Sequence, residues 1–187
     1  MFSSYKKWSN KYSATGLKGF TLLELLIVIS IIAILSVALI LVLNPAEALK
    51  KSRDTNRISD VNTIKTALGI YLTSTTTPWL GGATADTSCG TIKSSTTTLV
   101  TLVDGTGWIP VNLLSLTGGA PISNLPNDPL NTGIYGYWYK CNSANKTFEV
   151  SAVLESSAYG PGGADDKSAK DGGNESGRYE VGTDLTL

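Results

Sequence analysis

Apolar residues dominate one stretch near the start of this 187-residue chain, from Phe20 to Leu43. About 20 consecutive apolar residues let a helix cross a bilayer, so the stretch predicts a transmembrane helix. Its only charged residue is Glu24. Because an ionised side chain near the bilayer centre costs about 2.5 to 3.5 kcal/mol on insertion scales, we expect Glu24 to have a function and a positively charged partner.

The pattern becomes amphipathic over residues 44–72. Apolar residues recur there mostly at intervals of three and four, with charged residues between them, as on a helix with one buried face. These apolar residues are Ile58, Val61, Ile64, Leu68, Tyr71 and Leu72. Asn44-Pro45 interrupts the pattern, because proline lacks a backbone donor. A kink at Pro45 within one long helix and a second helix that begins at Pro45 both fit the sequence.

Two later segments, residues 134–141 and 147–154, alternate with the period of a β-strand. Residues 142–146 between them predict a turn, so the two segments form a β-hairpin. Its aromatic residues suit the half-buried face of a sheet, and we expect the hairpin to cover the amphipathic helix. That helix should end near Leu72, because β-branched residues and then Pro78 follow.

Weaker patterns complete a predicted globular head, residues 73–187. They predict a strand over residues 97–103, a short helical segment near residues 111–116 and a last strand over residues 178–181. The result is an α+β fold, in which a long and partly transmembrane N-terminal helix packs its second half on a small antiparallel sheet.

Charge is unevenly distributed, although 15 basic and 15 acidic residues balance overall. The first 19 residues hold four lysines and no acidic residue, whereas six basic residues face eleven acidic ones after Thr73. Without its first 19 residues the protein is acidic, so a surface for nucleic acid is not evident. Basic residues lie on both sides of the apolar stretch and do not decide its orientation.

Motifs for catalysis are missing from the sequence. It contains no histidine, no Gly-x-Ser-x-Gly sequence and no P-loop, and its two cysteines are far apart. Nucleophilic, phosphoryl-transfer and zinc chemistry therefore lack their usual groups. We expect a protein that is not an enzyme.

A basic segment, a glycine and a glutamate early in the apolar stretch form a specific pattern, Lys18-Gly19-Phe20-Thr21-Leu22-Leu23-Glu24. This pattern closely resembles the leader of type IV prepilins. The resemblance implies that residues 1–19 are a leader peptide, which a prepilin peptidase removes by cutting between Gly19 and Phe20 in the cytoplasm. It also implies that the new Phe20 amine is methylated and that Glu24 pairs with this amine on a neighbouring subunit.

By this resemblance the chain is a structural subunit of a type IV pilus-like filament. Its partners would be copies of itself in a helical filament, the peptidase and a membrane assembly platform. The helix of residues 20–43 would cross the cytoplasmic membrane in the precursor, with the leader inside, and lie in the filament core afterwards. The mature form would then belong to a filament at the cell surface or in the periplasm.

Other functions stay open. Residues 125–129, with Tyr135 and Tyr137 after them, resemble the segment before the sheet in major pseudopilins of type II secretion systems, although Leu130 stands where those proteins usually have tryptophan. A membrane-anchored adhesion or binding protein is a further alternative.

The start of the chain also has two simpler interpretations. A secretory signal peptide would be cut near Ser36-Val37-Ala38, but its apolar core is usually shorter. A plain membrane anchor leaves Gly19 and Glu24 without a role.

Cys89 and Cys141 lie in the part that the prepilin resemblance places outside the cytoplasm, where disulfides persist. A disulfide between them is our expectation, and two unpaired thiols are the alternative.

Residues 156–177 are rich in Gly, Asp, Ser and Asn, which predicts an exposed acidic loop. Its carboxylates include Asp165, Asp166 and Asp171, which are hard oxygen ligands of the kind that calcium takes. Major pseudopilins bind calcium in a comparable loop, but the EF-hand spacing is absent here. A calcium site and a solvated loop without a cofactor are both open.

Overall fold

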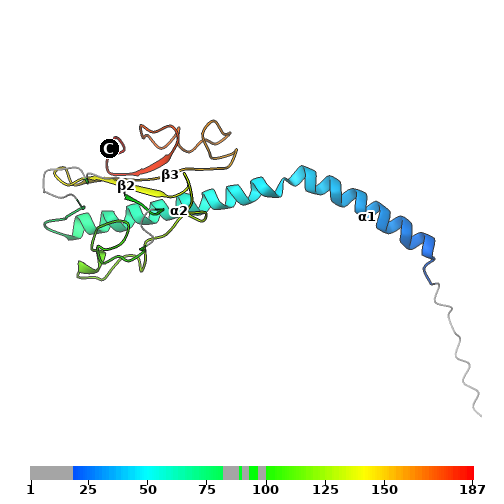
Figure 1. Cartoon of the computed structure of the whole chain (residues 1–187), viewed down its shortest axis with the longest axis horizontal. Coiled ribbons are helices and arrows are strands. Elements are labelled where there is room, and N and C mark those ends of the chain that lie inside the picture. Colours follow the sequence, from blue (N-terminus) through cyan, green and yellow to red (C-terminus); the bar gives the residue numbers. More distant parts are fainter. Residues whose placement is uncertain (1–18, 82–88, 90–92, 97–99) are drawn as a thin grey trace, which may run out of the picture. The chain divides into compact units, whose positions relative to one another are not determined.

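The computed structural model describes residues 19–81, 89, 93–96 and 100–187 (Figure 1). The chain divides into two compact units, one ending at Leu43 and the other beginning at Asn44. Residues 1–18, which make up nearly all of the predicted leader, lie outside the described residues.

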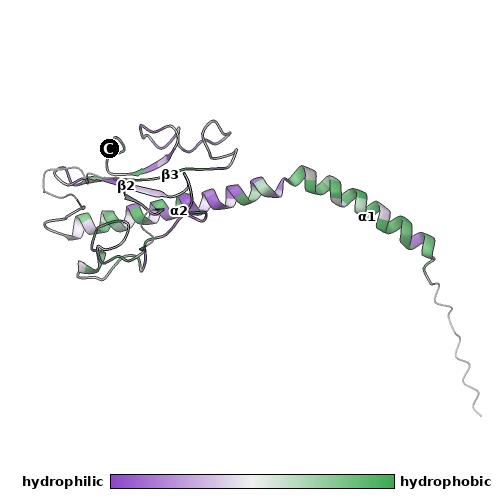
Figure 2. Cartoon of the chain, in the orientation of Figure 1, coloured by the Kyte–Doolittle hydropathy of each residue, from purple (hydrophilic) through white to green (hydrophobic). Residues whose placement is uncertain are grey.

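The first unit contains helix α1, Leu22–Leu43. Its segment Leu22–Ile40 is long and apolar enough to cross a membrane, and none of it is buried within the structure. Figure 2 shows α1 as hydrophobic along nearly its whole length, whereas the next helix alternates between hydrophilic and hydrophobic residues. The apolar pattern of the sequence therefore corresponds to one complete helix.

The second unit begins with helix α2, Pro45–Ser74. Asn44 has a left-handed backbone, with φ 40° and ψ 72°, and its side-chain oxygen accepts a hydrogen bond from the Glu47 N–H. The kink predicted at Pro45 is therefore a break between two helices, because Asn44 leaves the helical conformation and caps α2. Proline suits the first turn of α2, where its missing N–H would have no partner in the helix. The helix ends two residues beyond the predicted Leu72.

Four antiparallel strands form one sheet in the order β1-β2-β3-β4 (Figure 1). They are β1, Lys93–Ser94; β2, Tyr137–Asn142; β3, Thr147–Ala152; and β4, Tyr179–Gly182. The predicted hairpin is confirmed as β2 and β3, with β2 starting three residues later than expected. The last predicted strand is confirmed as β4, whereas β1 is too short to leave a sequence pattern.

The core of the head lies between one face of α2 and one face of the sheet. Tyr137 and Tyr139 on β2 and Phe148 and Val150 on β3 are fully buried. The residues that α2 contributes are Val61, Ile64, Ala67, Leu68 and Tyr71. The α+β fold, with the amphipathic helix beneath a small antiparallel sheet, is thus as the sequence predicted.

The segment before the sheet differs from the prediction. Residues 97–99 of the expected strand lie outside the described residues, and residues 100–103 do not form a strand. Instead, the carbonyls of this segment accept hydrogen bonds from loop N–H groups: Val100 from Trp108, and Val103 from Leu113. The predicted helical segment is a single 3₁₀ turn, Leu113–Ser115.

Cys89 and Cys141 form a disulfide, with their Cα atoms 5.1 Å apart. The Cys89 N–H also donates a hydrogen bond to the Cys141 carbonyl, at 2.8 Å. The cross-link ties the segment around Cys89 to β2, as we expected. The alternative of two free thiols is therefore wrong.

Candidate processing and assembly segment

Gly19 and Phe20 lie just before α1, outside any helix or strand, and both are exposed. A Cβ atom added at Gly19 would meet no other atom within 4 Å, and Gly19 is not among the glycines with positive φ. The fold of the chain therefore gives no reason for glycine at this position. If position 19 requires a small residue, the reason is binding to another molecule and not the packing of the described chain.

Thr21 caps the first turn of α1. Its side-chain oxygen accepts a hydrogen bond from the Glu24 N–H at 3.1 Å. A threonine followed three residues later by a glutamate is the spacing of a capping box, and a carboxylate in the first turn is favoured by the helix dipole. Sequence reasoning missed this local role of Glu24, although the Thr-x-x-Glu spacing signals it.

The Glu24 side chain is exposed, and among the described residues none forms an ion pair with it. A carboxylate in this state suits an aqueous boundary but is costly inside a bilayer or a bundle of helices. In such surroundings Glu24 needs a cation that the described part of its own chain does not provide.

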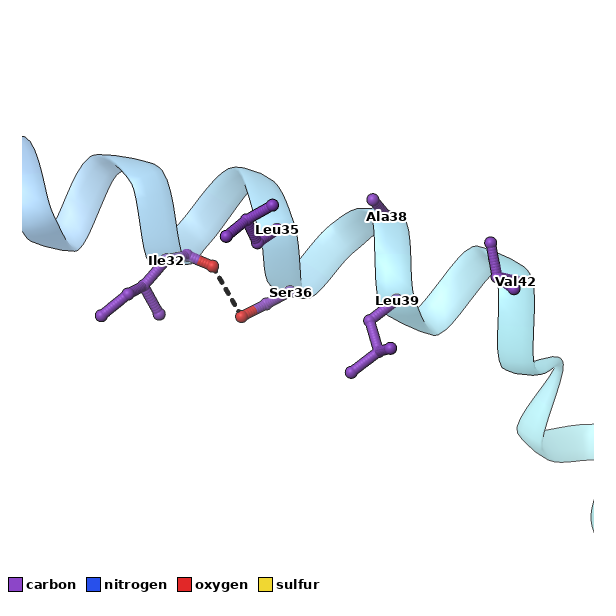
Figure 3. A pocket seen from close by; sticks show the side chains of 6 residues that line it. All are labelled: Ile32, Leu35, Ser36, Ala38, Leu39 and Val42. Carbon is purple, nitrogen blue, oxygen red and sulfur yellow. Dashed lines mark hydrogen bonds between the residues drawn. The ribbon is translucent and has the colours of Figure 1, made fainter.

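The surface of α1 is apolar all around its circumference. Between Leu22 and Leu43 its large side chains are 47% to 82% exposed. In Figure 3 the side chains of Ile32, Leu39 and Val42 project away from the helix, and all three are more than half exposed. Because apolar surface is stabilised by roughly 25 cal/mol for each Å² removed from water, α1 requires lipid or other helices around it.

The two serines of α1 do not conflict with an apolar environment. Ser30 donates its hydroxyl to the Leu26 carbonyl at 2.8 Å, and Ser36 donates to the Ile32 carbonyl at 2.7 Å (Figure 3). Each hydroxyl is satisfied within its own helix, so its transfer out of water costs little. Apart from Glu24, the polar side chains of α1 that the structure describes have their partners within the helix.

A family model described as the prokaryotic N-terminal methylation motif matches residues 17–40. The chain carries the class III leader of type IV pilins and pseudopilins. The matched range contains Gly19, Phe20 and Glu24, and it covers most of α1. This prepilin-like leader implies processing by a prepilin peptidase and a precursor anchored in the membrane. No curated protein and no solved structure matches the chain.

A buried ionic cluster, which we call the Arg57 cluster, lies in the head. It consists of Arg53, Asp54, Arg57, Asp128 and Glu155. The Arg57 guanidinium is fully buried and binds both oxygens of Asp128, at 2.6 and 3.1 Å. One of its nitrogens also donates to Asp54 at 2.8 Å and to Glu155 at 2.7 Å.

Opposite charges hold this cluster together despite its burial. Burial by itself lowers the pKa of Arg57, but hydrogen bonds to Asp128, Glu155 and Asp54 outweigh that effect and raise it. Asp54 also accepts hydrogen bonds from the backbone N–H groups of Glu155 and Ser156. The cluster therefore ties α2 to two loops of the head.

The sequence analysis placed the charged residues of this helix between the buried apolar positions, and for Asp54 and Arg57 this was wrong, because both are buried. Positions 54, 57, 61, 64 and 68 follow one another at spacings of three and four. Both charged residues therefore extend the buried stripe toward the start of the helix, whereas the sequence analysis began the stripe at Ile58. The spacing could have revealed this; the partners Asp128 and Glu155 could not be found from it.

The three candidate calcium ligands do not converge. Asp165 pairs with Lys167 and Lys170, at 2.5 and 2.8 Å. The pKa of Asp165 is lowered to about 2, chiefly by its hydrogen bond from Lys167. Among the described residues, no three His, Cys, Asp or Glu side chains are grouped so as to hold a metal ion.

The other two aspartates close turns of the loop. Asp166 accepts hydrogen bonds from the Gly162 N–H and the Ser168 hydroxyl, both at 2.7 Å. Asp171 accepts from the N–H groups of Gly173 and Glu180, both at 2.8 Å. Calcium at these residues stays a prediction, and binding would have to replace these hydrogen bonds.

The acidic loop is also less solvated than predicted at its start. Ser156 is buried, and the Ser157 N–H and hydroxyl both donate to the Glu47 carboxylate near the beginning of α2. Side-chain hydrogen bonding to Ser157 is the main cause of the lowered pKa of Glu47. The loop therefore packs on α2 through polar contacts that its composition did not indicate.

Proposed function

We propose that this chain is the structural subunit of a type IV pilus-like filament. The observation that carries the proposal is α1, an apolar helix of 22 residues that is exposed all round and follows a class III leader. A helix of this kind is stable either among lipids or among other helices. Copies of the same helix are the partners that a filament provides.

The proposed sequence of events begins in the cytoplasmic membrane. The precursor crosses it once, with the basic leader inside, and the peptidase cuts between Gly19 and Phe20. Gly19 and Phe20 are exposed and therefore accessible to such an enzyme. Cleavage creates an amine at Phe20, which is then methylated.

Assembly then moves α1 from lipid into a bundle of helices on the assembly platform. Glu24 supplies a negative charge five positions into the mature chain, and the Phe20 amine of a neighbouring copy supplies the positive one. In a medium of low dielectric constant an unpaired charge is far more costly than a matched pair, so the pair selects one register between subunits. The chain acts by assembly and not by catalysis, and the mature filament lies at the cell surface or in the periplasm.

A pseudopilin of a type II secretion system is the second candidate. The observation that favours it is the segment of residues 125–129, which resembles the segment before the sheet in major pseudopilins. Leu125 lies in the core and Asp128 binds Arg57, just before the hairpin. This candidate predicts short periplasmic filaments, whereas a pilus subunit predicts long fibres on the cell surface.

The test compares Glu24→Val with Ser36→Val in cells that contain the peptidase and the assembly platform. Both changes replace a polar residue of α1 by an apolar one, but only the first removes the charge. We expect both variants to insert into the membrane and to be cleaved, and only Glu24→Val to lose most of its fibres in electron micrographs.

Fibres of Glu24→Val at the normal yield would contradict the register role. Absence of fibres from the unmodified chain, with normal cleavage, would contradict the filament and favour a membrane-anchored adhesion or binding protein. The length and location of any fibres decide between pilus and pseudopilus.

A further inference from the structure

Two glutamates are buried on the face of the sheet that points away from α2. Glu149 on β3 and Glu180 on β4 are each only 1% exposed. Their neighbours Phe148, Val150 and Val181 point into the core, so alternation along the strands places both glutamates on the opposite face. In Figure 1 most of the chain that follows β3 lies over this face.

The register of the strands makes the two glutamates diagonal neighbours. Glu149 pairs with Gly182, and Glu180 pairs with Ser151. Residues two apart on facing strands are close enough for long side chains to touch, and Glu180 is among the groups that raise the pKa of Glu149. Two ionised carboxylates at this separation repel each other strongly where water is excluded.

Each carboxyl group also has a buried oxygen that lacks a donor. Within the described part of the chain, no group donates a hydrogen bond to Oε2 of Glu149 or to Oε1 of Glu180. The other oxygen of Glu180 accepts from the Glu175 N–H at 3.0 Å. A buried acceptor without a donor destabilises the fold. A proton shared between the two carboxyl groups would give both oxygens a hydrogen-bond partner.

Lys140 on β2 does not supply that hydrogen. Its Nζ is 3.8 Å from Oε1 of Glu149, which is too long for a hydrogen bond. It donates instead to Glu175 at 3.1 Å and to the backbone oxygen of Leu187 at 2.7 Å. The positive charge of Lys140 is thus shared with groups outside the pair.

We propose that Glu149 is protonated and that its O–H donates a hydrogen bond to the Glu180 carboxylate. This hydrogen bond stabilises the position of β4, and of the chain around it, on the sheet. One hydrogen between the two groups satisfies both vacant oxygens and removes the repulsion. The remaining negative charge lies on Glu180, whose carboxylate already accepts from the Glu175 N–H.

The electrostatics of the surroundings agree with this arrangement. Burial raises the pKa of Glu149 to about 7, and the neighbouring charge and hydrogen bond of Glu180 act in the same direction, while Lys140 opposes them. The other charged groups nearby are Glu175, which pairs with Arg178, and Asp171, which accepts from the Glu180 N–H. The charged residues of α2 lie on the other side of the sheet.

The consequence is a head that loosens as the pH rises. A carboxyl group whose pKa is higher in the folded state than in the unfolded state stabilises the fold while it is protonated. Its contribution is complete below the unfolded pKa of 4.5 and is lost as the pH rises to about 7. Loss of the proton leaves two like charges under the segment of residues 171–175, where Gly173 lies against the Glu180 carboxylate.

The proposal is tested by thermal unfolding of the full chain in detergent micelles, followed by near-ultraviolet circular dichroism between about pH 5 and pH 8. Between these two pH values the ratio of folded to unfolded protein should fall on the order of 100-fold more in the unmodified chain than in Glu149→Gln. The reason is that the amide of the variant donates a hydrogen bond to Glu180 at every pH. The difference between the two chains is the quantity to measure, because burial also raises the pKa of Asp60 in α2.

Glu175→Gln is the matched control, since it removes a more exposed carboxylate beside the same lysine. It should keep the pH dependence of the unmodified chain. If Glu149→Gln does not fold, Glu180→Gln removes the neighbouring charge from Glu149, and the pH dependence should become smaller, because only burial then raises the pKa of Glu149.

A direct observation of the proton completes the test. Infrared difference spectra at about pH 6 should contain a protonated carboxyl band that disappears in Glu149→Gln. Protection of the β4 amides against hydrogen exchange, relative to the intrinsic exchange rate at each pH, should also fall at higher pH in the unmodified chain and not in Glu149→Gln. A folded Glu149→Gln with unchanged pH dependence, or a missing carboxyl band, would overturn the proposal.

Discussion

The two helices of this chain are stabilised in different ways. Helix α1 exposes apolar side chains around its whole circumference, and the structure buries none of its candidate span. Helix α2 buries one stripe, from Asp54 to Tyr71, under the sheet and loops of the head. The comparison teaches that α2 belongs to a folded domain, whereas α1 depends on molecules other than its own chain.

Their charged residues follow the same division. In α1 the only charge, Glu24, is exposed and has no ion-pair partner among the described residues. In α2 the buried Arg57 has three carboxylates around it, from the helix itself and from two loops. A change in α1 should therefore affect assembly, and a change in the Arg57 cluster should affect folding.

The largest expected effect is the loss of processing when Gly19 becomes bulky. Gly19→Leu should leave the leader attached and prevent filament formation completely, while the head folds normally, because in the described part of the chain nothing packs against this position. N-terminal mass spectrometry and thermal unfolding measure the two effects. Gly19→Ala is the control, since alanine is also small and should permit cleavage.

Normal cleavage of the leucine variant would show that position 19 is not read by the peptidase. A mature chain that begins after Ala38 would favour the signal-peptide interpretation instead. Either result would contradict the assignment of α1 to assembly and α2 to folding, because the segment before α1 would no longer be the one that the peptidase recognises.

The next effect concerns the head alone. Arg57→Met should destabilise it by about 3 to 5 kcal/mol, because removal of one partner leaves buried carboxylates unpaired. Denaturant unfolding of the full chain in micelles measures the loss, and membrane insertion should not change. Arg53→Met is the control: Arg53 is partly exposed and, among the described residues, forms an ion pair with Glu155 alone, so its loss should be clearly smaller.

Equal losses for the two arginine variants would show that burial of Arg57 does not decide its contribution. Reduced insertion of Arg57→Met would show that the two units are not independent in the membrane. The comparison between α1 and α2 would then need revision.

The smallest effect is expected from calcium. Its addition should leave the thermal unfolding of the head unchanged, because Asp165, Asp166 and Asp171 already accept hydrogen bonds from separate groups of the protein. Magnesium and a chelator are the controls. A stabilisation by calcium alone that Asp171→Ala abolishes would establish a site and show that the loop rearranges to form it.

Local patterns were sufficient for much of the fold. The apolar stretch, the amphipathic stripe and the strands β2, β3 and β4 appear in the sequence as periodic signals, since side-chain direction follows the backbone repeat. The sequence also predicted an interruption of the helix at Asn44-Pro45, but it did not decide between a kink and two separate helices. Two helices and not a kink result because Asn44 takes a left-handed conformation that sequence alone does not require.

Other elements depended on contacts between distant residues. Residues 100–103 have the composition of a strand, but hydrogen bonds to neighbouring loops take up their carbonyls. Strand β1 has only two residues and exists because β2 offers a free edge. Such short pieces carry too little pattern to be recognised without their partners.

The sequence by itself determined the segment that matches the methylation motif, because Gly19, Phe20 and Glu24 form a local pattern that needs no contact with distant residues. It also determined that α1 requires an apolar environment. Only the tertiary structure decided which charged residues are buried: Arg57 with Asp128, and Glu149 beside Glu180. The physical reason is that burial of a charge depends on partners far away in the sequence, whereas exposure of an apolar helix depends on its own residues alone.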